Sequence, residues 1–101
     1  LLEVDGDSMW PDYQDGELIA CRAPYSIRDL NDGIPCIFRE LDGTAFKYLE
    51  WVPLDGEPDK KIPIGRPANH RYPAVRFRSL SDVRIEYVVL GRAGELGKVT
   101  R

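Results

Sequence analysis

The sequence has few of the residues that most often carry metal or redox chemistry. It contains one histidine, His70, and two cysteines, Cys21 and Cys36. These residues are too few for a zinc site, and we expect neither a metal nor another cofactor. Both cysteines lie in apolar, strand-like runs, which favours buried free thiols over the alternative of a disulfide between neighbouring strands. His70 lies in a proline-rich stretch, which predicts an exposed loop.

Long apolar runs are also missing. No segment approaches the roughly 20 apolar residues that a membrane-spanning helix needs, and no signal peptide follows Leu1 and Leu2. We therefore expect a cytoplasmic protein without a membrane partner. Because the first residue is not Met, we also expect a fragment or processed product of a longer chain.

Basic residues are outnumbered, with 14 Lys and Arg against 17 Asp and Glu. A net charge of −3 argues against this domain being the part that grips nucleic acid. The charges are uneven: residues 1–59 carry 14 acidic and 4 basic groups, and residues 60–101 carry 3 acidic and 10 basic groups. Two charged ends could pair in a dimer. We favour the alternative that strands from both halves interleave and mix the charges.

Short strand-like segments alternate with turn signals, and 43% of the residues are hydrophobic. This pattern predicts a single mainly-β domain over residues 1–101, with six or so short strands. Asp42-Gly43 predicts a hairpin with a type I′ turn. Residues 53–73 hold five prolines and are expected to be loop-rich, and the tail from Gly94 to Arg101 is expected to fray. The predicted strands are 17–22, 34–41, 44–52, a short one near 61–64, 74–78 (Val75 and Phe77 inward) and 83–92 (Val83, Ile85, Tyr87 and Val89 on one face).

The stretch from Val4 to Pro11, Val-Asp-Gly-Asp-Ser-Met-Trp-Pro, is the most informative. Gly6 permits a tight backbone path, and Asp7 or Ser8 can cap a short helical turn whose free N–H groups surround the serine. Such N–H groups can stabilise the oxyanion of an acyl-transfer intermediate. Ser8 is thus either a nucleophile or an ordinary helix cap.

A serine nucleophile needs a base, and His70 has no evident orienting partner. A lysine serves instead where burial makes it neutral. Lys47 lies among large apolar residues in Thr44-Ala45-Phe46-Lys47-Tyr48-Leu49, whereas the other lysines, Lys60, Lys61 and Lys98, lie in polar segments. The alternative is that Lys47 is a strand residue facing solvent.

These two motifs resemble those of the LexA-like family of serine–lysine peptidases, which includes phage repressors and UmuD-type proteins and is related to signal peptidases. Gly-Asp-Ser-Met-x-Pro is similar to the nucleophile motif, and the turn and strand over 42–49 are similar to the segment that carries the lysine base. Residues 67–75 and 85–92 also resemble segments of that family, so the similarity spans most of residues 4–92.

The resemblance implies a LexA/signal-peptidase-like fold of bent antiparallel sheets with a short helical turn at the nucleophile. It implies that Ser8 attacks a peptide bond, that Lys47 is the general base, and that backbone N–H groups of Asp7 and Ser8 form the oxyanion site. Met9 and Trp10 are candidates to line the substrate cleft. The implied protein is the self-cleaving, homodimeric C-terminal part of a transcriptional repressor, whose substrate is its own linker.

In such repressors an activated recombinase filament favours cleavage, and DNA is bound only through an N-terminal domain. Neither that domain nor a scissile segment lies within these 101 residues. A non-catalytic dimerisation or sensor module of a transcriptional regulator is the alternative function. A signal-peptidase-type enzyme, which normally needs a membrane anchor, is a third and less favoured one.

Overall fold

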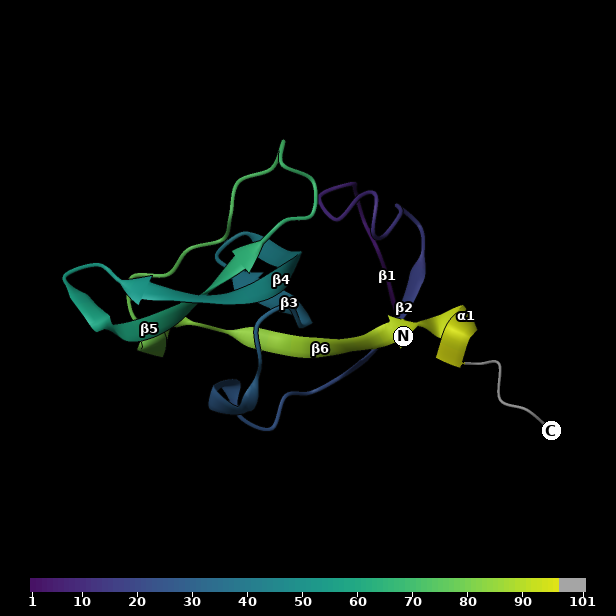
Figure 1. Cartoon of the computed structure of the whole chain (residues 1–101). Helices are drawn as coiled ribbons and strands as arrows, with labels where there is room; N and C mark the ends of the chain where they lie inside the picture. Colours follow the sequence, from purple (N-terminus) through teal and green to yellow (C-terminus); the bar gives the residue numbers. More distant parts are fainter. Residues whose placement is uncertain (97–101) are drawn as a thin grey trace.

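The computed structural model describes residues 1–96, which form one antiparallel sheet of six strands (Figure 1). The strand order across the sheet is β1-β2-β6-β3-β4-β5. The mainly-β prediction is confirmed, with one sheet rather than several. The elements are β1 (Leu2–Glu3), β2 (Leu18–Arg22), the 3-10 turn η1 (Ile27–Asp29), β3 (Pro35–Glu40), β4 (Gly43–Leu54), β5 (Glu57–Arg66), the 3-10 turn η2 (Leu80–Asp82), β6 (Ile85–Arg92) and helix α1 (Ala93–Leu96).

The hairpin between β3 and β4 forms as predicted, but its turn does not. Glu40 pairs with Gly43, so the two loop residues are Leu41 and Asp42, one position earlier than predicted. A type I′ turn needs positive φ at both central residues. No non-glycine residue within 1–96 has positive φ, so the type I′ prediction is wrong.

Strand β5 is longer than the sequence indicated, running over ten residues where four were predicted. Its prolines, Pro58 and Pro63, are tolerated because β5 is the edge strand and one side of its backbone needs no partner. The strand predicted over 74–78 is reduced to a single bridge between Gly65 and Val75. Val75 is buried and Arg76 is exposed, as the alternation predicted.

Strand β6 does not present one apolar face. Its pairing with β3 shifts register between Ile37 and Phe38, and its pairing with β2 shifts at Ala20. Val88 and Val89 point to opposite sides of the strand, and both are buried because a core cluster covers each face of the sheet. The prediction that Val83, Ile85, Tyr87 and Val89 share a face is wrong, because Ile85 packs against the cluster that contains Val88, whereas Val89 belongs to the cluster on the other face.

The core consists of two clusters on opposite faces of the sheet, since consecutive strand residues point to opposite faces. Residues 4–13, which contain Ser8, cover the first cluster, and the segment around Leu30 with Phe77 covers the second. The first cluster is Val4, Met9, Tyr13, Ile19, Ile37 and Val89. The second is Leu30, Cys36, Phe38, Leu49 and Val88.

The two oppositely charged halves of the sequence interleave in space. Strand β6, from the basic half, lies between β2 and β3 from the acidic half. Ion pairs cross between the halves, so the charges mix as we favoured. These pairs are Arg92 with Glu17, Arg66 with Glu50, and Arg39 with Glu86.

The cysteines are free, as expected from their apolar surroundings. Cys21 in β2 and Cys36 in β3 pair with β6 from opposite sides, so β6 separates the two cysteines. They do not lie on neighbouring strands, and the alternative of a disulfide is excluded. Burial raises the pKa of the Cys36 thiol to about 12, which keeps it protonated and unreactive.

The described part of the chain, residues 1–96, has no helix of the length and apolarity that crossing a membrane requires. Of the tail expected to fray, Gly94 lies in α1, and residues 97–101 lie outside the described residues.

Candidate functional site

Ser8 lies in a single tight turn between β1 and β2. Gly6 takes a φ of 89°, and its N–H donates to the Asp15 carboxylate at 2.8 Å. The Trp10 N–H donates to the Asp7 carbonyl at 3.1 Å, which closes the turn around Ser8. The expected helical stub is therefore one turn that does not continue as a regular helix.

The side chains of Asp7 and Ser8 do not cap this turn, contrary to one prediction. The Asp7 carboxylate accepts a hydrogen bond from the Tyr72 hydroxyl. The Ser8 hydroxyl donates to the backbone carbonyl of Phe46 in β4, with 3.5 Å between the oxygens. Ser8 is thus directed at the strand that carries the candidate base.

The residues after Ser8 fix the turn on the sheet. Met9 is 1% exposed and belongs to the first core cluster. Its side chain therefore anchors the turn. Trp10 is 55% exposed beside it. The structure places Trp10, rather than Met9, where a bound peptide could touch it.

Lys47 follows Phe46 directly and is the buried charged residue of the core, with 6% of its surface exposed. Among the side chains of residues 1–94, no carboxylate lies within ion-pair distance of it. Burial lowers the pKa of Lys47, and the charge of Glu40 partly opposes that shift. The sequence-based alternative, a strand lysine facing solvent, is wrong.

The Ser8 hydroxyl contacts β4 at Phe46, the residue before Lys47, and no hydrogen bond joins the Ser8 and Lys47 side chains in the described residues. The Ser8 contact with Phe46 is long for an O–H···O hydrogen bond, so the hydroxyl is weakly held. Catalytic hydrogen bonds are often long before substrate binds.

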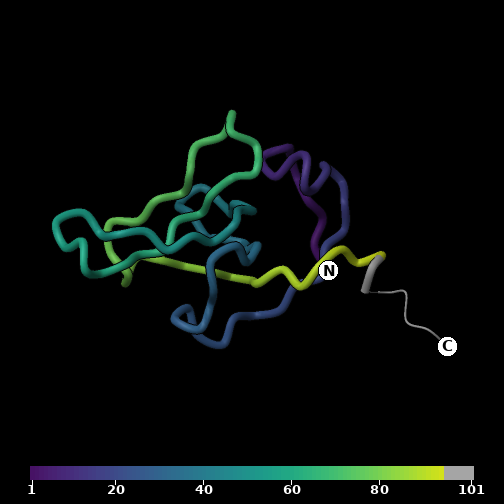
Figure 2. Tube along the Cα trace, viewed as in Figure 1, coloured from purple at the N-terminus to yellow at the C-terminus, as the bar shows by residue number. Residues whose placement is uncertain are grey.

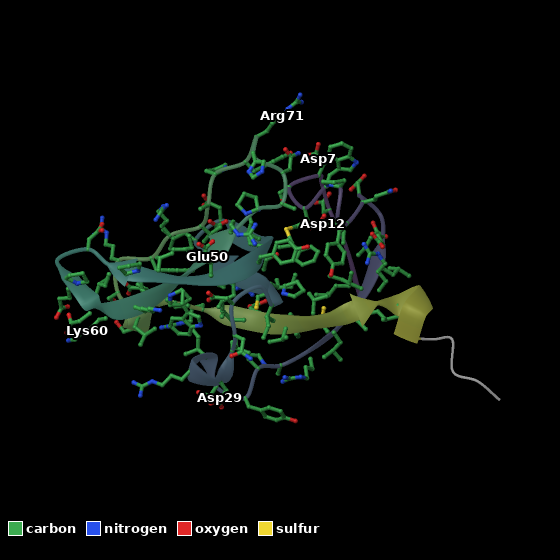
Figure 3. All side chains as sticks on the ribbon, in the orientation of Figure 1. Asp7, Asp12, Asp29, Glu50, Lys60 and Arg71 are labelled. Carbon is green, nitrogen blue, oxygen red and sulfur yellow. The ribbon has the colours of Figure 1, made fainter. Side chains whose placement is uncertain are left out.

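Tyr72 connects the two candidate residues. The Lys47 Nζ lies 5.8 Å from the centre of the Tyr72 ring, and the Tyr72 hydroxyl donates to Asp7, the residue before Ser8. The loop that carries Tyr72 follows β5 and extends to the N-terminal turn (Figure 2). Figure 3 shows Asp7 beside this loop, which bears Arg71 near its tip.

Gly65 of β5 provides room for the Lys47 side chain. A Cβ at this position would lie 3.0 Å from Lys47 Cβ and 3.1 Å from Lys47 Cγ. Both distances are closer than carbon atoms normally approach, so any larger residue would push against the lysine stem. The sequence did not predict this role of Gly65, because the residues around a glycine do not indicate which side chain of the neighbouring strand packs against it.

One edge of β4 is open beside Ser8. Residues 43–47 pair with β3, whereas pairing with β5 begins only at Tyr48. Since backbone groups alternate sides in an antiparallel strand, those of Thr44 and Phe46 point to this open edge. A hollow of about 210 Å³ adjoins it, lined by Leu2, Glu3, Val4, Asp5, Ile19, Ile37, Thr44 and Phe46. This edge can accept an extended peptide as an added strand.

The structure gives little support to a site built on His70 or on a metal ion. His70 is exposed, as predicted. In residues 1–94, whose side chains the structure describes, no three His, Cys, Asp or Glu side chains are grouped closely enough to hold a metal ion.

Three comparisons, with protein-family models, with curated proteins and with solved structures, find no significant match to this chain.

Proposed function

We propose that this domain is a serine–lysine endopeptidase, with Ser8 as nucleophile and neutral Lys47 as general base. One observation carries the proposal: the Ser8 hydroxyl contacts the backbone of β4 at Phe46, immediately before a buried lysine that has no carboxylate partner among the side chains of residues 1–94. A buried ammonium without a counterion is costly, so a lysine in this position favours its neutral, basic form.

The reaction follows from these groups. Lys47 Nζ accepts the hydroxyl proton as Ser8 Oγ attacks the scissile carbonyl carbon, and backbone N–H groups near Ser8 stabilise the oxyanion. The tetrahedral intermediate collapses as Lys47 returns the proton to the leaving amine. Water then hydrolyses the acyl-enzyme, with Lys47 accepting and returning a proton again.

The substrate is an extended peptide bound along the open edge of β4. The resemblance to LexA-like repressors extends the proposal to the parent protein: a dimeric transcriptional repressor that cuts its own linker. In that case DNA binding belongs to a separate N-terminal domain, and a recombinase filament is the inducing partner.

The test incubates the chain with a peptide library between pH 7 and pH 10 and identifies cut bonds by mass spectrometry. We expect cleavage that rises with pH and is lost in Ser8→Ala and Lys47→Ala. Lys61→Ala is the matched control, because Lys61 is exposed, and it should cleave normally. Absence of cleavage by the unaltered chain would favour the non-catalytic module, and cleavage by Ser8→Ala would contradict the proposed chemistry.

A further inference from the structure

Asn69 uses all four of its polar groups within one small region. Its backbone N–H donates to the Ser8 carbonyl at 2.9 Å, and its side-chain Nδ2 donates to the Asp7 carbonyl at 3.0 Å. Its Oδ1 accepts from the Arg71 N–H at 3.1 Å, and its backbone carbonyl accepts from the Tyr72 N–H at 3.1 Å. Two groups thus fix the loop, and two fix the turn around Ser8.

The two carbonyls that Asn69 contacts belong to the peptide units on either side of Ser8. The Asp7 carbonyl shares a peptide plane with the Ser8 N–H, and the Ser8 carbonyl shares one with the Met9 N–H. In a trans peptide the C=O and N–H bonds point in opposite directions. Asn69 contacts both carbonyls, and the Trp10 N–H also donates to that of Asp7, so Asn69 contributes to the directions in which the Ser8 and Met9 N–H groups point.

Those two N–H groups have no hydrogen-bond partner among residues 1–94. They flank the hydroxyl that would attack the substrate, so they can receive the developing oxyanion. A hydrogen bond to a peptide carbonyl also polarises the N–H of the same unit, which makes it a stronger donor.

We infer that Asn69 is a positioning residue that orients the Ser8 and Met9 peptide N–H groups as the oxyanion site. The inference rests on the proposed peptidase function. It keeps the Ser8 N–H expected from the sequence and takes the Met9 N–H in place of that of Asp7. It also explains why asparagine stands here, since aspartate cannot donate when ionised and glutamine is one methylene longer.

Asn69→Asp tests the inference with little change in shape. It keeps an acceptor for the Arg71 N–H but places a carboxylate oxygen against the Asp7 carbonyl. In the peptide-cleavage assay we expect kcat to fall about 10-fold to 100-fold with KM unchanged, somewhat less than the loss on deleting an oxyanion donor. His70→Ala, an exposed neighbour in the same loop, is the matched control and should retain wild-type kcat.

A second measurement does not depend on activity. In chain labelled with both ¹³C and ¹⁵N, the scalar coupling across the hydrogen bond from Asn69 N–H to the Ser8 carbonyl should be observable. The Ser8 and Met9 amide signals should move in Asn69→Asp but stay in place in His70→Ala. The urea midpoint of each variant shows whether it is folded.

The outcomes separate the two ideas. A folded Asn69→Asp variant with wild-type kcat, or with a raised KM and unchanged kcat, would overturn the positioning role. Unmoved Ser8 and Met9 amide signals would overturn it as well. If the unaltered chain cleaves nothing, the proposed function fails, and the amide signals then decide whether Asn69 orients this turn.

Discussion

Replacing Gly65 with alanine tests the packing around the candidate base most sharply. The new Cβ would lie 3.0 Å from Lys47 Cβ and 3.1 Å from both Lys47 Cγ and Phe38 Cε2. The backbone has little freedom to retreat, because Gly65 and Val75 exchange two hydrogen bonds of 2.8 and 2.9 Å. Overpacking of this kind costs about 1–3 kcal/mol.

The stabilising effect of replacing a glycine with alanine is smaller than this cost. Gly65 has no left-handed φ, so alanine suffers no backbone strain and lowers the entropy of the unfolded chain, which contributes about 0.4–1 kcal/mol of stability. We therefore expect Gly65→Ala to lower the free energy of unfolding by about 1–2 kcal/mol. For a domain of this size that corresponds to a melting temperature lower by roughly 5–15 °C.

Urea unfolding followed by tryptophan fluorescence measures this loss. Gly94→Ala is the matched control, because a Cβ there meets nothing within 4 Å, and we expect it to be neutral or slightly stabilising. A Gly65→Ala variant as stable as the unaltered chain would refute the described packing of β5 against the Lys47 stem. Reduced peptide cleavage in the same variant would connect that packing to the site.

Three further substitutions test other parts of the structure. Lys47→Met should raise the free energy of unfolding at pH 7 by on the order of 1 kcal/mol, since it removes the cost of burying the lysine ammonium or of deprotonating it on folding. Burial lowers the pKa of Lys47 in the folded chain, so between the folded and unfolded pKa values Lys47 is protonated only in the unfolded chain. The stability gained by Lys47→Met is therefore complete below the folded pKa. It vanishes as pH rises past the unfolded pKa near 10.4. A difference in urea midpoint that does not shrink above pH 10 would contradict this. Trp51→Phe removes the indole N–H that donates to the Leu30 carbonyl at 2.8 Å and should cost about 1–3 kcal/mol in the same assay. Arg66→Gln breaks an exposed ion pair with Glu50 and should change stability by less than about 1 kcal/mol, so a larger loss by thermal melting would contradict the exposed geometry.

The strands could be predicted where the apolar pattern and turn residues of a segment agree with its place in the sheet. The run from Leu18 to Arg22 and the hairpin around residues 41–42 form close to their expected places. Strand β5 was underestimated because Pro58 and Pro63 argue against a strand in general, and only the complete sheet shows that β5 lies at an edge. The register shifts of β6 depend on both neighbouring strands, so no pattern within residues 85–92 reveals them.

The candidate site likewise contains residues that sequence motifs predicted and residues whose contacts only the fold shows. The motifs around Ser8 and Lys47 indicated both residues, and the structure brings their strand and turn together. The roles of Asn69 and Tyr72 were missed, although their loop was noted. An asparagine close to prolines signals a turn, but only the fold shows which backbone groups it contacts.

The pH dependence of peptide cleavage tests the central claim most directly. If buried Lys47 is the base, the rate should rise with pH, with an apparent pKa below the ordinary lysine value, and it should be lost in Lys47→Ala. Cleavage that stays at the wild-type rate in Lys47→Ala, or that does not change with pH from 6 to 10, would contradict the account.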